Sequence, residues 1–219
     1  MGKEILSARQ VAFLKIMSRP SPLSEIFYLT GGTALAAFYL NHRFSEDLDF
    51  FSLNEVDALA VTAFLKSYQT TLGFTVFEFQ QSFNRNLFFL QYPDEVLKTE
   101  FTYFPFPCLE KGSRQGALRV DSLRDIAVNK VFTVHQKPRA RDFVDLYFIL
   151  QQTKWSFMEL LNEARIKFDT AIDLVQMGGH LLKVRELKDM PRLKIAFSPD
   201  DCEKLFLDIA ASFKKDIVV

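Results

Sequence analysis

The sequence changes character near residue 121, and this change limits the folds that the chain can adopt. Before it, β-branched and aromatic runs predict strands at residues 26–30, 48–52, 74–79, 86–91, 96–103 and 118–120. After it, apolar residues follow helical periodicity almost to the C-terminus. We therefore expect an α+β protein, with a small mixed β-sheet domain over residues 1–120 and a helical domain over residues 121–219.

The composition excludes several classes of protein. The chain has 219 residues, of which 48% are hydrophobic and 25% charged, as in ordinary globular proteins. Lys plus Arg equals Asp plus Glu at 27 each, so any nucleic-acid contact must come from a local basic patch. Cys108 and Cys202 are too few for a disulfide framework, and no apolar stretch reaches the roughly 20 residues that cross a bilayer. These features predict a cytoplasmic protein without a membrane partner.

Two aspartates alternate with apolar residues at the second expected strand. In residues 45–51, S-E-D-L-D-F-F, a period of two places Asp47 and Asp49 on one face of the strand. Carboxylates at this spacing can bind one or two Mg²⁺ ions that are shared with phosphates. The alternative is the solvated face of an edge strand. Near the centre of a sheet, however, two acids on one face would repel each other unless a cation compensated them.

A third acid, Glu100, lies in residues 97–101, L-K-T-E-F. If its strand pairs beside residues 48–52, Glu100 completes a site of three carboxylates. If it does not, Glu100 is an ordinary solvated side chain.

Gly31 and Gly32 fall where the strand at residues 26–30 ends and a helix begins. Glycine lets the backbone approach a ligand closely, and a helix start presents unpaired N–H groups, so a triphosphate could bind there. The alternative is a plain tight turn in which Thr33 is the N-cap of the helix. A further helix is expected from a cap at Asn54 to about residue 69.

Taken together, these motifs strongly resemble the first motif of the AbiEii-type nucleotidyltransferases. These are bacterial and archaeal proteins of the polymerase-β superfamily and are often toxins of toxin–antitoxin pairs. The resemblance lies in residues 29–35, L-T-G-G-T-A-L, and 42–50, H-R-F-S-E-D-L-D-F, with weaker matches at Lys130 and residues 141–147, R-D-F-V-D-L-Y.

The resemblance implies that Asp47 and Asp49 hold metal and that the glycine turn holds phosphates. It also implies roles near the nucleotide for Ser45, Lys130 and one of the later aspartates. The sequence departs from the family pattern twice. Gly32 lacks the hydroxyl that a serine can supply at the second turn position, and Glu100 stands where an aspartate is more usual.

The residues of the later motif leave their own roles open. Asp142 and Asp145 share a helix face, and Arg141 and Asp145 have the spacing of a surface ion pair. Lys130 would either balance the charge of a triphosphate or be a solvated lysine. A basic cluster between two helices, which contains Arg139 and Arg141, could face an RNA backbone.

The resulting hypothesis is Mg²⁺-dependent transfer of a nucleoside monophosphate from an NTP to an acceptor. Its metal ligands are Asp47, Asp49 and Glu100, and an acid such as Glu100 would take the acceptor's proton. The phosphates would be bound by the N–H groups of the glycine turn together with basic and hydroxyl side chains. The substrate-binding residues are Gly31, Gly32, Thr33, Arg43, Ser45 and Arg141, and further catalytic roles fall to Lys130, Asp142 and Asp145.

Several partners remain open at this point. The acceptor could be tRNA or another RNA, a protein hydroxyl, or a small molecule such as an aminoglycoside, and a cognate antitoxin is an expected protein partner. The chief alternative is a catalytically degenerate family member that binds a nucleotide or a partner protein without chemistry. A helical scaffold with an incidental pair of aspartates is a further alternative.

Overall fold

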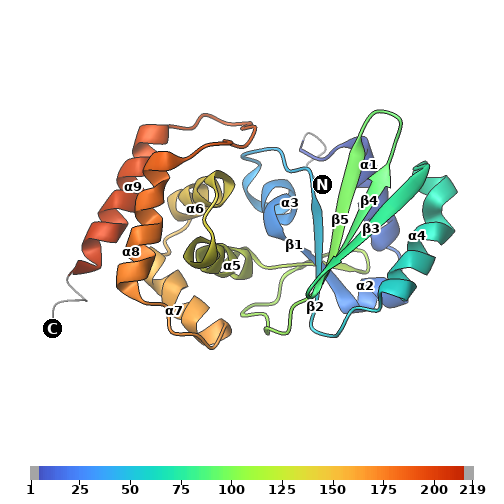
Figure 1. Cartoon of the computed structure of the whole chain (residues 1–219), viewed down its shortest axis with the longest axis horizontal. Helices are drawn as coiled ribbons and strands as arrows, with labels where there is room; N and C mark the ends of the chain where they lie inside the picture. Colours follow the sequence, from blue (N-terminus) through green and yellow to red (C-terminus); the bar gives the residue numbers. More distant parts are fainter. Residues whose placement is uncertain (1–4, 215–219) are drawn as a thin grey trace. The chain divides into compact units, whose positions relative to one another are not determined.

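The computed structural model describes residues 5–214, in which a sheet-containing unit precedes a helical one. The chain divides into Met1–Leu123 and Arg124–Val219, which run from blue to green and from olive to red in Figure 1. The expected α+β class, with helices in the C-terminal part, is confirmed. The separate roles expected of the two parts stay predictions.

The first unit is built on a mixed sheet with the strand order β3-β4-β5-β2-β1-β7-β6. Its strands are β1 (Phe27–Thr30), β2 (Leu48–Ser52), β3 (Val76–Ser82), β4 (Arg85–Gln91), β5 (Val96–Tyr103), β6 (Ser113–Gln115) and β7 (Leu118–Val120). β2 is parallel to β5 and antiparallel to β1, and β1 is parallel to β7. β2 therefore lies inside the sheet, with a hydrogen-bonded strand on each side.

The helices of this unit are α1 (Ala8–Met17), α2 (Pro22–Ile26), α3 (Gly31–Leu35), the π-helical η1 (Ala36–Leu40) and α4 (Ala58–Leu72). Two expected caps are wrong. α4 begins after Asp57, whose carboxylate accepts hydrogen bonds from two backbone N–H groups of the first turn, so Asn54 lies outside the helix. Thr33 lies within α3, and Thr30 holds the N-cap position without a side-chain cap bond.

One face of the sheet forms an aromatic core. Phe50 of β2 stacks on Phe101 of β5 at 5.1 Å between ring centroids, and Phe88 of β4 meets Phe101 edge-on at 6.0 Å. Phe13 of α1 lies 5.8 Å from Phe50, and Figure 1 shows α1 and α4 together on one side of the strands. Because side chains alternate along a strand, Asp49 and Glu100 lie on the opposite face.

The second unit contains α5 (Leu123–Gln136), α6 (Ala140–Gln152), α7 (Phe157–Lys167), α8 (Leu174–Leu182), the 3₁₀-helical η2 (Lys183–Glu186) and α9 (Pro199–Ser212). Aromatic contacts join these helices: Phe143 of α6 meets Phe206 of α9 at 5.0 Å, and Phe132 of α5 stacks on Phe168 at 3.9 Å. In the part of the chain that the structure describes, no helix combines the length and apolar character that a membrane span requires.

Candidate functional site

Asp47 and Asp49 stand at the start of β2. Leu48 and Phe50, which alternate with them, have no exposed surface, whereas both aspartates are half-buried. Because β2 is hydrogen-bonded on both sides, the alternative of a wet edge strand is wrong. The sheet thus holds two carboxylates on one face of an interior strand, where their mutual repulsion requires positive charge nearby.

Glu100 is the direct neighbour of Asp49 in the parallel register of β2 and β5. It is buried, with 5% of its surface exposed, so the alternative of a solvated side chain is wrong. The sheet brings the three expected carboxylates together on one face, which we call the carboxylate face: Asp47, Asp49 and Glu100.

Glu100 is bound by two neighbouring side chains. Arg85 donates from Nε and Nη2 to its two carboxylate oxygens at 2.6 Å each, and the Thr102 hydroxyl donates to Oε1 at 2.8 Å. Burial alone would raise the pKa of Glu100, but these hydrogen bonds prevail and hold the pKa below its usual value. The pKa of Arg85 is raised, chiefly by its bond to Glu100 and further by the charges of Asp49 and Asp47.

A second basic side chain, Lys98, reaches the same face. Its ammonium lies 2.8 Å from Oδ2 of Asp47. The sequence analysis missed both Lys98 and Arg85. Lys98 stands two residues before Glu100 and shares its face by the period of a strand, so alternation could have indicated it. Arg85 could not have been found without the register that places β4 beside β5.

The glycine turn lies against the carboxylates. Gly31 has a left-handed φ of 72°, and a Cβ built at this position would collide with the Asp49 carboxylate. A Cβ at Gly32 would collide with the guanidinium of Arg43 and lie 3.2 Å from the Ser45 hydroxyl oxygen. Glycine thus lets side chains pack directly on the backbone at both positions, and at Gly31 it also allows the left-handed φ.

The loop between η1 and β2 is held from several sides. Arg43 is buried and donates from Nη1 to the Phe44 carbonyl at 2.9 Å. The Thr33 hydroxyl donates to the Asp47 carbonyl, so Thr33 positions an aspartate rather than capping its helix. Gln10 of α1, another residue that the sequence analysis missed, donates from Nε2 to the Ser45 carbonyl at 2.8 Å and the Glu46 carbonyl at 3.1 Å.

In the helical unit, Lys130 joins two buried aspartates. Its ammonium lies 2.8 Å from Asp142 and 2.7 Å from Asp145, both of which have no exposed surface. The alternatives of a solvated Lys130 and of an Asp145 surface pair with Arg141 are therefore wrong. Burial alone would raise the pKa of Asp142, but the charges of Lys130 and Arg139 hold it below its usual value. The expected roles of these residues next to a nucleotide stay predictions.

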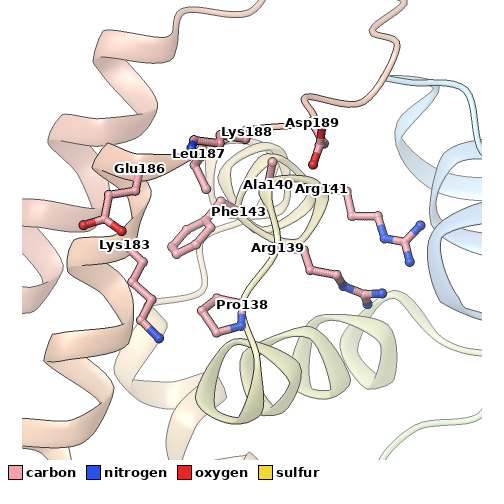
Figure 2. A pocket seen from close by; sticks show the side chains of 10 residues that line it. All are labelled: Pro138, Arg139, Ala140, Arg141, Phe143, Lys183, Glu186, Leu187, Lys188 and Asp189. Atoms are coloured by element: carbon pink, nitrogen blue, oxygen red, sulfur yellow. The ribbon is translucent and has the colours of Figure 1, made fainter.

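The same unit contains a cavity of about 460 Å³ at the start of α6. Figure 2 shows the Arg139 and Arg141 side chains extending in one direction from the α6 end, and Lys183 on the facing segment. Basic residues outnumber acidic ones in the lining, which consists of Pro138, Arg139, Ala140, Arg141, Phe143, Lys183, Glu186, Leu187, Lys188 and Asp189. The cavity therefore suits an anionic ligand.

The carboxylate face has the ligand chemistry that a divalent cation needs. Asp47 and Asp49 present half-buried carboxylate oxygens on one face, with Glu100 beside them. The positive groups of Lys98 and Arg85 lie against Asp47 and Glu100, so two of these acids are paired with the protein's own cations. Hard oxygen ligands of this kind are those that Mg²⁺ prefers, so the residues present fit this ion.

The chain is similar to several known proteins. The family model "Nucleotidyl transferase AbiEii toxin, Type IV TA system" matches residues 15–214. An uncharacterized protein of Aquifex aeolicus (strain VF5) is 32% identical over 144 residues, which cover 65% of this chain and 66% of that protein. The chain thus spans slightly less than two thirds of the length of that relative.

Two solved structures show the same fold. JHP933 from Helicobacter pylori matches with a TM-score of 0.59 and 18% identity, over 96% of this chain and 94% of that one. MenT4, a nucleotidyltransferase toxin from Mycobacterium tuberculosis, matches with a TM-score of 0.54 and 14% identity, over 95% and 84% of the two chains.

Proposed function

The chain belongs to the AbiEii family of nucleotidyl transferase toxins, and we propose that it transfers a nucleoside monophosphate from an NTP to an acceptor with the help of Mg²⁺. The observation that carries this proposal is the contact of Gly31 with Asp49. It joins a helix start, which suits phosphates, to a carboxylate face that suits a metal ion.

Each part of this site has a distinct task in the proposal. The backbone N–H groups of Gly31, Gly32 and Thr33 bind phosphate oxygens, and the Arg43 guanidinium and Ser45 hydroxyl beside Gly32 add side-chain donors. Asp47 and Asp49 would hold Mg²⁺, which supplies charge neutralisation for the triphosphate and for the departing pyrophosphate when bound. Because phosphoryl transfer depends mainly on positioning and electrostatics, the fixed loop before β2 is as important as the ligands themselves.

Glu100 enters this proposal as the third carboxylate of the face. A carboxyl whose pKa is held low accepts a proton poorly, and Arg85 and Thr102 hold the pKa of Glu100 low. We therefore assign Glu100 the task of balancing charge beside the metal rather than that of general base.

We propose RNA as the acceptor, with the basic cavity of the helical unit as the element that contacts its backbone. The chain as a whole carries no net charge, so a local concentration of cations at Arg139, Arg141, Lys183 and Lys188 is the feature that would bind phosphates. Such contacts position a nucleic acid without selecting its sequence.

The test is incubation of the protein with each labelled NTP in turn, Mg²⁺ and total RNA, followed by separation of labelled RNA from labelled protein. Label in RNA supports the proposal, and label in protein would move the acceptor to a protein hydroxyl. Absence of label from all products, with nucleotide binding retained, would support a degenerate binding protein instead.

As a member of this family, the chain is further proposed to be the toxin of a toxin–antitoxin pair. Expression in a bacterial host should arrest growth, and co-expression of any small antitoxin-like reading frame found beside the gene should restore it. An equal arrest by an Asp49→Asn variant would show that the toxicity is unrelated to nucleotide transfer.

A further inference from the structure

Two basic side chains form ion pairs with the carboxylate face, and the two pairs differ in geometry and in exposure to solvent. Arg85 binds Glu100 through two parallel hydrogen bonds of 2.6 Å, and the Glu100 side chain is only 6% exposed. Lys98 binds Asp47 through one contact of 2.8 Å, and the two side chains are 25% and 28% exposed. The Arg85 pair is thus bidentate on a buried carboxylate, although the Arg85 side chain itself is 51% exposed, whereas the Lys98 pair is a single contact between two partly exposed side chains.

This difference determines which of the two basic side chains a metal ion can displace from its carboxylate. A bidentate pair between arginine and a buried carboxylate is strong and geometrically fixed, and Thr102 donates a third hydrogen bond to the same carboxylate. A lysine ammonium on a flexible stem, paired near the surface, gains little from its partner and can move at low cost. Asp47 is therefore the carboxylate that a competing cation can take over.

A divalent ion at Asp47 would displace the Lys98 ammonium, because like charges repel strongly at short distance outside bulk water. The released ammonium stays tethered to β5, two residues from Glu100 on the same face. The glycine turn follows β1, which flanks β2 on the side opposite to β5, and it lies against Asp49 because Thr30 pairs with that residue. The freed cation thus remains beside the place where a triphosphate would bring new negative charge.

We propose that Lys98 is a nucleotide-binding residue that neutralises Asp47 in the absence of metal and transfers its charge to the NTP polyphosphate when a divalent ion occupies Asp47. This inference rests on the proposed function and deepens it. Lys98 opposes the binding of metal alone and favours the binding of nucleotide together with metal. The two ligands are thereby coupled, and each strengthens the binding of the other.

The test measures binding rather than turnover, on the full chain. Mn²⁺ binding without nucleotide is followed by its paramagnetic resonance signal, and binding of a non-hydrolysable ATP analogue is followed by calorimetry in saturating Mn²⁺. In Lys98→Met we expect Mn²⁺ alone to bind about tenfold more tightly, and the analogue about tenfold more weakly, than in the parent protein. Lys98→Arg should restore analogue binding, and Lys66→Met, an exposed lysine of α4, should change neither.

Two results would overturn the inference. Equal Mn²⁺ affinity in the parent and in Lys98→Met would show that Lys98 does not compete for Asp47. A loss of both affinities, accompanied by a lower melting temperature, would make Lys98 a structural residue. If the parent protein itself binds neither Mn²⁺ nor the analogue, the proposed function fails and this inference fails with it. If the parent binds both and Lys98→Met binds them equally well, only the inference fails.

Discussion

Asp49 and Glu100 are paired neighbours in parallel register, and the backbone of Gly31 closes the other side of Asp49. A carboxylate in this position faces a second acid on one side and the glycine turn on the other. This arrangement is expected for a metal ligand rather than for a residue that stabilises the fold.

Asp49→Asn should abolish nucleotide transfer while leaving the protein folded. The change keeps the shape of the side chain but removes one of three clustered negative charges, which relieves repulsion in the metal-free protein. The measurement is thermal melting with and without Mg²⁺ and NTP, together with the labelled-transfer assay. Glu46→Gln, at an exposed neighbouring position, is the matched control. A variant that melts lower yet transfers at the parent rate would remove Asp49 from the metal site.

Gly31→Ala should destabilise the protein more than Gly73→Ala. Both glycines have left-handed φ angles, 72° and 77°, so each substitution costs about 1–2 kcal/mol of backbone strain. A Cβ at Gly73 meets nothing within 4 Å, whereas a Cβ at Gly31 meets the Asp49 carboxylate. Urea denaturation of the two variants gives the loss of unfolding free energy for each, and the difference reports the contact of the added Cβ with Asp49. Equal losses would show that the turn adapts without moving Asp49.

Lys130→Met should destabilise the helical unit by about 3–5 kcal/mol, because it removes a cation that pairs with two buried carboxylates. Lys137→Met, at an exposed position shortly after α5, should change stability by less than about 0.5 kcal/mol. Denaturant titration of both variants provides the comparison. If Lys130→Met remains as stable as the parent but loses transfer, Lys130 serves the reaction and not the fold.

Stability should fall in acid, in part through Asp142. The pKa of Asp142 is lowered in the folded state, so its contribution is fully present above the unfolded pKa of about 4 and is lost as the pH falls through the folded value. Urea titrations between pH 7 and pH 3 should show a declining free energy of unfolding. Asp142→Asn should flatten the acid part of that curve, and an unchanged slope would contradict this assignment.

The two cysteines should react differently with thiol reagents. Burial raises the pKa of Cys202 to about 12, so almost no thiolate is present at neutral pH, whereas Cys108 is exposed. Mass spectrometry after brief treatment of the native protein should find one modified thiol, in the peptide that contains Cys108. Modification of Cys202 at a similar rate would mean that α9 opens readily.

The parts of this structure that follow from local patterns could be predicted from the sequence. Strand periodicity and flanking turns predicted the bounds of β2 and β5, whereas the register that pairs Asp49 with Glu100 is known only from the folded sheet. α2 escaped prediction because its 5 residues are too few to show helical periodicity, although Pro22 suits the first position of a helix.

The pairing of charges could not be predicted, because it depends on which faces meet. Helical periodicity placed Asp142 and Asp145 on one face but did not reveal that Lys130 of α5 lies against both. Likewise, the hairpin register that brings Arg85 to Glu100 is a property of the folded sheet. Long-range contacts between titratable groups are the information that a single sequence lacks.

The side-chain amide of Gln10 joins two segments that are distant in sequence. Its oxygen accepts from the Ser7 N–H in the first turn of α1, while its nitrogen holds the Ser45 and Glu46 carbonyls ahead of Asp47. Fraying of that turn therefore also frees the backbone segment that positions Asp47. We therefore expect local unfolding of the N-terminal helix and loosening of the loop before β2 to be coupled, and amide hydrogen exchange in the two segments should rise and fall together.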